Sequence, residues 1–275
     1  MKPIIAMMYD FDKTLCTKDM QEYSFMPKVG MDAKEFWKQT DELVTTTSMD
    51  PILAYMYLMI RKSNLNEISI RREDFVSLGA NIEYFDGVET YFKNIDSYAE
   101  SLGLKVEHYI ISSGLKEIIE GCKIKDNFKE IYACEFHYDH NGLASWPKMA
   151  VNYTTKTQFL FMINKGCGSN EVNDFVPNDE RRIPFRNMIY IGDGLTDVPC
   201  MKLVKVNGGQ SIAVYQNERS KLITDKLMLD KRVDFTAKAD YRDNSDLVNI
   251  VKTILDKMKV VNELVSIHRE IEKNL

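Results

Sequence analysis

The chain has 275 residues, of which 44% are hydrophobic, and its 41 acidic side chains against 36 lysines and arginines give a net charge of −5. This composition suffices for a buried core and argues against disorder, and the length suits one large domain or a domain with a sizeable insertion. No block rich in lysine or arginine stands out, so the sequence does not indicate a nucleic-acid-binding surface. We expect a small soluble molecule as the partner and no nucleic acid.

The five cysteines are scattered and contain no Cys-x-x-Cys pair, so they predict neither a disulfide framework nor a zinc site. This usage fits a reducing compartment, and the apolar stretch before Asp10 is too short for a signal peptide. The longest strongly apolar stretch, residues 51–60, is too short to span a membrane, which takes about 20 residues. We therefore predict a cytoplasmic protein without a membrane partner, and the oligomeric state stays open.

The first predicted strand is the apolar run IIAMMY at residues 4–9, because short continuous apolar runs are typical of strands buried in a parallel sheet. From residue 16 to residue 87 the pattern is instead helical, as in DAKEFWKQTDELV at 32–44 and PILAYMYLMIRK at 51–62. We interpret residues 16–87 as an inserted helical subdomain. Gly87 marks the point where the chain returns to the sheet.

Three later apolar runs predict further strands, each followed by a turn and a helical pattern: HYIIS at 108–112, NMIYIG at 187–192 and SIAVY at 211–215. Alternating strands and helices are typical of α/β proteins. The predicted fold is therefore α/β, with a doubly wound, mostly parallel sheet formed by residues 1–15 and 88–275. An all-helical subdomain is inserted into it at residues 16–87.

Two segments between these strands have other patterns. The stretch KEIYACEFHYDHNGLASWP at 129–147 predicts a β-hairpin at the sheet edge with an Asn-Gly turn. We interpret His137 and His140, which flank this turn, as surface histidines rather than as a metal pair. The polar stretch at 167–185 predicts a surface loop that is long for this fold class, and the sequence assigns it no purpose.

Asp10 and Asp12 directly follow the first predicted strand, where a buried strand has no structural need for two carboxylates. Neighbouring like charges repel and resist ionising together, so something has to compensate them. Ligands bind at the carboxyl ends of the strands in parallel α/β sheets. Further polar residues fall at such ends or just after them: Ser112, Lys156, Asp193 and Asp197.

Taken in order, these features resemble the four sequence motifs of the haloacid dehalogenase-like superfamily, in its phosphatase branch. The resemblance covers the core, roughly residues 1–15 and 88–255, and the insertion matches in position and helical character. The layout is most similar to the phosphoserine phosphatase-like group, because it combines a helical insertion with a hairpin after the second motif. The resemblance implies a Rossmann-like core and a helical cap that closes over the active site.

The resemblance also implies phosphoryl transfer. Asp10 would be the nucleophile that forms an aspartyl-phosphate, and Asp12 would protonate the leaving group and then deprotonate water. Converging carboxylates call for a hard divalent cation, for which Mg²⁺ is the expected choice. By the family pattern its ligands would be the carboxylates of Asp10 and Asp193 and the backbone carbonyl of Asp12, with Asp197 steadying the site.

Ser112 and Lys156 would contribute a hydroxyl donor and a positive charge to the phosphate oxygens. Ser113 competes with Ser112 for this role, but Ser112 is the first residue past the apolar run, where the family places its hydroxyl. Lys148 and Lys165 compete with Lys156. We favour Lys156 because it follows the predicted hairpin and directly begins an amphipathic helix.

The resembled group places an acidic residue nine positions after the nucleophile to bind the substrate amine, and here this residue is Asp19. The resemblance also assigns Thr14, Gly114 and Gly194 to substrate binding, although turn geometry alone would explain either glycine. The sequence departs from this group's pattern at two points, and both argue against phosphoserine as the substrate. The acid is shorter than the usual glutamate, and the cap helix that should supply an arginine is aromatic and apolar until Arg61.

The sequence thus predicts an Mg²⁺-dependent phosphomonoesterase that acts on a small phosphorylated metabolite. A phosphotransferase or mutase would use the same residues, with an alcohol in place of water. A regulator that binds a phosphate ligand without turnover is the alternative outside enzymes. The presence of Asp10, Asp12, Lys156 and Asp193 argues against it.

Overall fold

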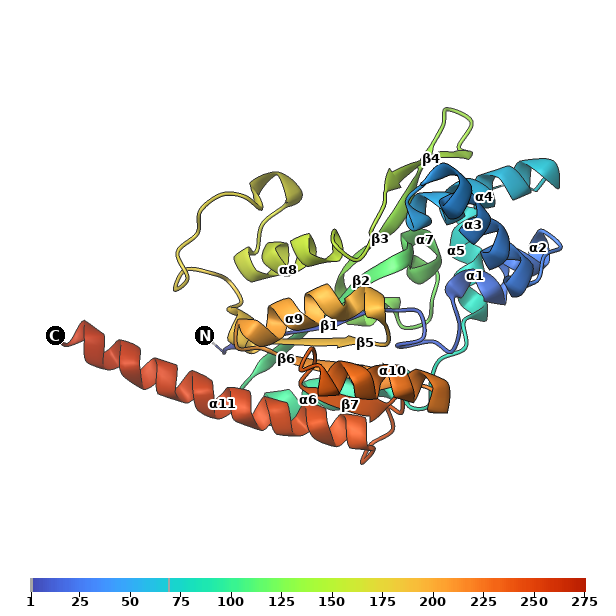
Figure 1. The fold of residues 1–275 in the computed structure, drawn as a ribbon. Helices are drawn as coiled ribbons and strands as arrows, with labels where there is room; N and C mark the ends of the chain where they lie inside the picture. The colour runs from blue at the N-terminus through green and yellow to red at the C-terminus, as the bar shows by residue number, and fades with distance from the viewer. Residues whose placement is uncertain (1, 69) are drawn as a thin grey trace.

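The computed structural model describes residues 2–68 and 70–275. At its centre lies a seven-stranded sheet with the strand order β4-β3-β2-β1-β5-β6-β7 (Figure 1). Neighbouring strands are parallel except for β3 and β4, which are antiparallel, so the predicted mostly parallel sheet is confirmed. The strands are β1 (Ile4–Tyr9), β2 (Lys105–Leu115), β3 (Phe128–Tyr138), β4 (Ala144–Met149), β5 (Met188–Gly192), β6 (Gln210–Tyr215) and β7 (Phe235–Lys238).

Helices cover both faces of this sheet, as a doubly wound fold requires (Figure 1). Helices α8 and α9 lie on one face, and α6 and α11 lie on the other. Because both faces are covered, β1 and β5 are buried along almost their whole length, and their sequences are continuously apolar. The helices of the core are α6 (Val88–Ser101), α7 (Lys116–Glu120), α8 (Lys156–Lys165), α9 (Val198–Val206), α10 (Glu218–Leu229) and α11 (Asp246–Lys273).

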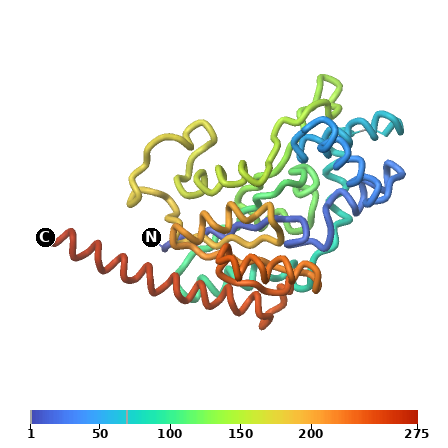
Figure 2. The backbone as a smooth tube through the Cα atoms, viewed as in Figure 1, coloured from blue at the N-terminus to red at the C-terminus, as the bar shows by residue number. Residues whose placement is uncertain are grey.

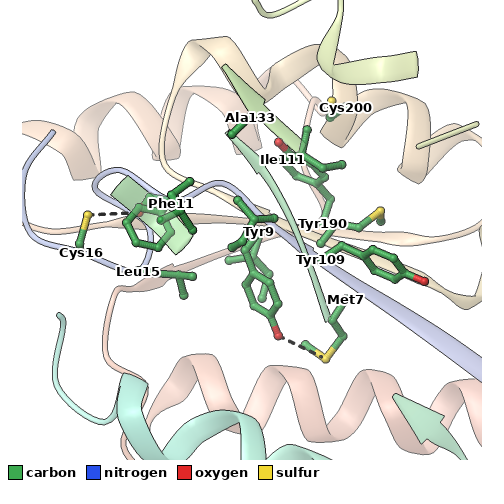
Figure 3. Close-up of a cluster of buried hydrophobic side chains, with 14 of the residues drawn as sticks. Met7, Tyr9, Phe11, Leu15, Cys16, Tyr109, Ile111, Ala133, Tyr190 and Cys200 are labelled. Carbon is green, nitrogen blue, oxygen red and sulfur yellow. Dashed lines mark hydrogen bonds between the residues drawn. The ribbon is translucent and has the colours of Figure 1, made fainter. Parts of the chain in front are cut away.

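The core around β1 contains the buried Tyr9, whose hydroxyl group has hydrogen-bond partners. Figure 3 shows Met7 and Tyr9 together, with the Tyr9 hydroxyl directed at the Met7 sulfur. The same hydroxyl lies 2.9 Å from Nδ1 of His108, whose Nε2 lies 3.1 Å from Asp96. These bonds satisfy side chains that would otherwise be unfavourable in an apolar interior.

Among the described residues, five α-helices lie between β1 and α6 and form the part of the chain coloured blue to cyan beside the sheet (Figure 2). No named strand interrupts them among the described residues of this region, which agrees with a helical insertion. Asp32 and Asp50 cap the two longest of these helices by accepting hydrogen bonds from the first turns. The helices are α1 (Met20–Tyr23), α2 (Phe25–Lys28), α3 (Ala33–Thr47), α4 (Pro51–Leu65) and α5 (Arg72–Leu78).

Two short connections join these helices to the sheet, and they run beside each other. Backbone amides donate from Thr17 to the carbonyl of Glu83, at 3.1 Å, and from Phe85 to the carbonyl of Leu15, at 3.1 Å. Gly87 is the N-cap residue before α6 and has a φ of 87°, and a Cβ atom there would lie 2.3 Å from the amide nitrogen of Arg242. Only glycine fits this re-entry.

The predicted hairpin is formed by β3 and β4, and it extends from the sheet edge to the inserted helices. Its turn also contacts the inserted helices, because Arg71 donates to the carbonyl of Asn141 at 2.7 Å and Ala144 donates to the carbonyl of Ile70 at 3.0 Å. The predicted surface histidines of this hairpin, His137 and His140, are exposed. No helix in residues 2–68 or 70–275 is long and apolar enough to cross a membrane.

Candidate active site

The polar residues predicted from the sequence gather at the carboxyl ends of three neighbouring strands. Asp10 follows β1, Asp193 follows β5, and β1 lies between β2 and β5 in the sheet. One expectation is corrected here: Ser112 does not end its strand, because β2 continues to Leu115, which pairs with Cys134 of β3. Ser112 and Ser113 lie in an irregular part of β2, between the paired residues Ile111 and Leu115.

Lys156 is the first residue of α8, and its ammonium group is buried between two carboxylates. Its Nζ lies 2.7 Å from Oδ1 of Asp10 and 2.7 Å from Oδ1 of Asp197. The Tyr190 hydroxyl donates to the same oxygen of Asp197 at 2.8 Å. Burial lowers the pKa of Lys156, but the two carboxylates outweigh burial and raise this pKa above its ordinary value.

The two competing lysines lie elsewhere. Lys148 forms an ion pair with Glu135 at 2.8 Å, and its side chain is more than half exposed. Lys165, at the other end of α8, donates to the backbone carbonyls of Val172 and Asp174. Of the three lysines, Lys156 is the one that reaches the carboxylates at the ends of β1 and β5.

The site holds more negative charge than Lys156 neutralises. One carboxylate oxygen each of Asp10, Asp193 and Asp197 lies within 4.8 Å of the others. Burial raises the pKa of Asp10 to about 7, although Lys156 lowers it. Burial and the charges of Asp10 and Asp197 likewise raise the pKa of Asp193 well above its usual range. Oxygen donors that repel one another in this way suit a hard divalent cation, which would favour their ionised forms.

Asp12 is held against the start of the inserted helices. Its Oδ1 accepts a hydrogen bond from the backbone amide of Met20 at 2.8 Å. Burial, followed by the charges of Asp19 and Asp10, raises the pKa of Asp12 well above its usual range. A Cβ atom at Gly114 would lie 2.9 Å from Oδ2 of Asp12 and 2.1 Å from Cε of Met20. The lack of a side chain at position 114 therefore lets Asp12 and Met20 approach β2.

The second glycine that the packing requires is Gly192, which the sequence analysis did not name. A Cβ atom there would lie 2.6 Å from the carboxyl carbon of Asp197. At Gly194, by contrast, the nearest atom would be Oγ1 of Thr196 at 3.8 Å, and the backbone amide donates to Asp197 at 3.4 Å. Protein packing thus leaves room at Gly194, and its predicted contact with substrate stays a prediction.

The predicted hydroxyl groups differ in their surroundings. The Ser112 hydroxyl accepts a hydrogen bond from the amide of Gly114 at 3.0 Å. The hydroxyls of Ser113 and Thr14 are buried and have no hydrogen-bond partner among the described residues. The carbonyl of Ser113 accepts a hydrogen bond from the hydroxyl of Tyr55 on α4 at 2.7 Å, so the inserted helices also contact this strand.

Asp19 has a partner that the sequence analysis missed. Its carboxylate forms an ion pair with Lys13, at 2.6 Å. Lys13 adopts a φ of 56° between Asp12 and Thr14, and its position inside the DFDKT stretch is the signal that could have identified it. Asp19 occupies the N-cap position of α1, but its side chain makes no capping hydrogen bond. The side chain of Asp19 is therefore held by its ion pair with Lys13 and not by capping α1.

Fold and site together define an α/β enzyme with a buried lysine–carboxylate cluster at the carboxyl ends of its strands. The model of the family described as haloacid dehalogenase-like hydrolase matches residues 7–202. The chain belongs to the haloacid dehalogenase-like hydrolase family, and the predicted family is confirmed.

Several proteins resemble the chain over most of its length. An uncharacterized protein of Borreliella burgdorferi is 29% identical and covers 90% of this chain and 94% of its own. A substrate-bound phosphoserine phosphatase structure has a TM-score of 0.58 at 14% identity, with 92% of this chain and 99% of that chain covered. A family hydrolase from Salmonella enterica serovar Typhi has a TM-score of 0.55 at 15% identity, over 84% of this chain and 66% of that one. These likenesses support the predicted layout of the fold.

The buried ion pairs predict the stability of a Lys156 variant. Lys156→Met should lower the free energy of unfolding by about 3–5 kcal/mol, because it leaves buried carboxylates without their partner. Urea unfolding in the presence of EDTA measures this change without a cation replacing the ammonium group. Lys148→Met removes an exposed ion pair and should change stability by about 1 kcal/mol or less. Similar small losses in both variants would contradict the assigned pairing.

Proposed function

We propose that the chain is an Mg²⁺-dependent phosphomonoesterase that hydrolyses a small phosphorylated metabolite through an aspartyl-phosphate on Asp10. The single observation that carries this proposal is the buried Asp10, bonded to Lys156 through one oxygen and placed beside Asp12 and Asp193. The proposal also rests on the family, whose members are described as hydrolases, and on the phosphoserine phosphatase fold neighbours.

Asp10 is suited to attack phosphorus. Lys156 donates to its Oδ1, and the backbone amide of Phe11 also hydrogen-bonds to its carboxylate. These donors orient the carboxylate at the end of β1. In the first step a bond forms between this carboxylate and phosphorus while the bond from phosphorus to the alcohol oxygen breaks. The ammonium group of Lys156 lies where it can also neutralise charge on the phosphate.

Asp12 supplies and recovers the proton. Burial and the nearby acids raise the pKa of Asp12, which favours the protonated carboxyl group that donation to the leaving alcohol oxygen requires. The hydrogen bond from the amide of Met20 fixes its orientation. In the second step Asp12 accepts a proton from water, water oxygen bonds to phosphorus, and the bond from phosphorus to Asp10 breaks. Inorganic phosphate is released, Asp10 is again a carboxylate and Asp12 is again protonated.

The donor set fits a magnesium ion. The carboxylates of Asp10 and Asp193 and the backbone carbonyl of Asp12 would hold it, and Asp197 would steady the arrangement through its bond to Lys156. The side chain of Asp193 forms no hydrogen bond or ion pair with other described residues, which leaves its oxygens available. When bound, the ion would supply positive charge to the phosphate oxygens.

The phosphate would be held by hydroxyl and backbone donors at the ends of β1 and β2. Ser112 remains our first choice for the hydroxyl donor, and the unpartnered hydroxyls of Ser113 and Thr14 are the alternatives. Buried polar groups without a partner are unfavourable, so a ligand that accepts their hydrogen bonds would stabilise the site. The amides of Gly114 and Gly194 would complete the cradle.

A panel of phosphomonoesters assayed with Mg²⁺ and with EDTA tests this function. We expect release of inorganic phosphate from at least one metabolite with Mg²⁺ and none with EDTA. Asp10→Asn should lower kcat by about 100-fold or more, because it removes the nucleophile. Asp126→Asn, which changes an exposed aspartate outside the site, should leave the rate unchanged.

Several outcomes would contradict the proposal. A rate within tenfold of the wild type in Asp10→Asn would reject this nucleophile, and full activity in EDTA would reject the metal. Phosphate that appears on an added alcohol instead of in solution would identify a phosphotransferase. Far-ultraviolet circular dichroism of each variant shows whether the fold is kept.

Asp19 offers a test of substrate class. An ammonium group on the substrate would have to take the place of the Lys13 ammonium on this carboxylate. If the substrate carries an amine near its phosphate, Asp19→Asn should lower kcat/KM for it by about 10- to 150-fold, the loss of one charge-assisted hydrogen bond. Phosphoserine and an aryl phosphate without an amine are the pair to compare, and the aryl phosphate should be hydrolysed almost as before.

The matched control is Asp41→Asn, which changes an exposed aspartate on α3 of the inserted helices. It should affect neither substrate strongly. Parallel losses on both substrates in Asp19→Asn would reject the specificity role. They would mean that Asp19 serves to position Lys13 instead.

A further inference from the structure

A second concave region lies at the opposite end of the sheet from the candidate active site. It is a cavity of about 280 Å³, and its lining includes Ile4, at the start of β1, and Asn187, directly before β5. Its other walls come from the loop before β5, to which the sequence assigned no purpose, and from α11. The N-terminus, this loop and the end of α11 come together on one side of the molecule (Figure 1). We call it the basic cavity after its cationic lining residues: Lys2, Arg181, Arg182, Arg186 and Arg269.

Within the described residues, three of these five cations lack an acidic partner. Arg182 is paired with Glu107, at 2.7 Å, and Lys2 is paired with Glu100, at 3.2 Å. Arg181, Arg186 and Arg269 form no ion pair with a carboxylate in the described part of the chain. Asp179 is the one acidic residue in the lining. On a chain with a net charge of −5, this is a local excess of positive charge.

Arg186 is the least satisfied of the three. Its Nε is buried and has no hydrogen-bond partner among residues 2–68 and 70–275. Burial, followed by the charge of Arg269, lowers the pKa of Arg186. Both arginines line the same cavity and their positive charges repel, so a bound anion would relieve both the repulsion and the missing hydrogen bond.

The walls of the basic cavity are held in place by hydrogen bonds. The amides of Asn187 and Asn262 bond to each other, at 2.9 and 3.2 Å, and join the start of β5 to α11. Arg181 donates to the side-chain oxygen of Asn164 on α8 at 3.2 Å. Arg269 donates to the backbone carbonyl of Asp179 at 3.5 Å. Arg181 and Arg269 thus bond to neutral acceptors, which leaves their positive charges uncompensated.

The size of the cavity limits the ligand. Its volume lies just below the range of about 300–1,000 Å³ that is typical of pockets for drug-sized molecules. A second cavity of about 270 Å³ shares Arg181 and Arg186, so these arginines can be approached from two sides. The planar guanidinium group matches phosphate oxygens in a bidentate manner.

We propose that the basic cavity binds a small polyvalent phosphate anion, through Arg181, Arg186 and Arg269. The anion would be a free di- or polyphosphate or the phosphate arm of a small metabolite, because both present the same oxygens. The cavity shares no lining residue with the candidate active site, so this proposal does not depend on the phosphatase activity.

Isothermal titration calorimetry with inorganic pyrophosphate tests the proposal. The full chain is used in EDTA, which keeps metal ions out of the carboxylate site, and potassium chloride holds the ionic strength constant. We expect saturable binding by the wild type, weakened about tenfold or more in Arg269→Gln and further in Arg186→Gln/Arg269→Gln. Arg269 is exposed, so its single variant should fold normally. Arg232→Gln, an exposed arginine outside both cavities, is the matched control and should bind as the wild type does.

A second titration with adenosine diphosphate distinguishes the two sources of the anion. Tighter binding than pyrophosphate would assign the cavity to the phosphate arm of a metabolite, and equal or weaker binding would assign it to free polyphosphate. The absence of saturable binding of both anions would overturn the proposal, as would equal pyrophosphate affinities in the wild type and in Arg269→Gln. Thermal unfolding of each variant checks that the fold is intact.

Discussion

The ammonium group of Lys156, buried between Asp10 and Asp197, is the interaction on which the site depends. It joins three elements that are distant in sequence: the end of β1, the turn after β5 and the start of α8. Burying these charges is favourable only when they pair closely, so their pairing fixes how the three elements meet. The same pairing orients the carboxylate of Asp10 at the end of β1.

The inserted helices contact the same site through individual residues. The amide of Met20 bonds to Asp12, and the hydroxyl of Tyr55 bonds to the carbonyl of Ser113. Lys13 and Asp19 form an ion pair at the first connection between sheet and insertion. The helices that would select a substrate therefore also orient the groups that would carry out the reaction. Substrate selection and catalysis would depend on the same contacts.

Local pattern was enough to predict much of this structure from the sequence. The apolar runs located β1, β5 and β6 to within one residue at either end, because strands buried on both faces have continuously apolar sequences. The extension of β2 past Ser112 was missed, since it depends on pairing with β3 and not on hydrophobicity. The pairing of Lys13 with Asp19 and the basic cavity were also missed. Both bring together side chains whose proximity only the folded chain determines.

Detection of the phosphorylated enzyme tests the central claim most directly. The Asp12→Asn variant should accumulate the intermediate, because it lacks the group that activates water. The variant is mixed with Mg²⁺ and an aryl phosphate, quenched in acid and digested, and tandem mass spectrometry locates the modification. The account predicts one added phosphoryl group on Asp10. Turnover of the wild type without a phosphoryl group on Asp10 of the variant, or with the group on another residue, would contradict it.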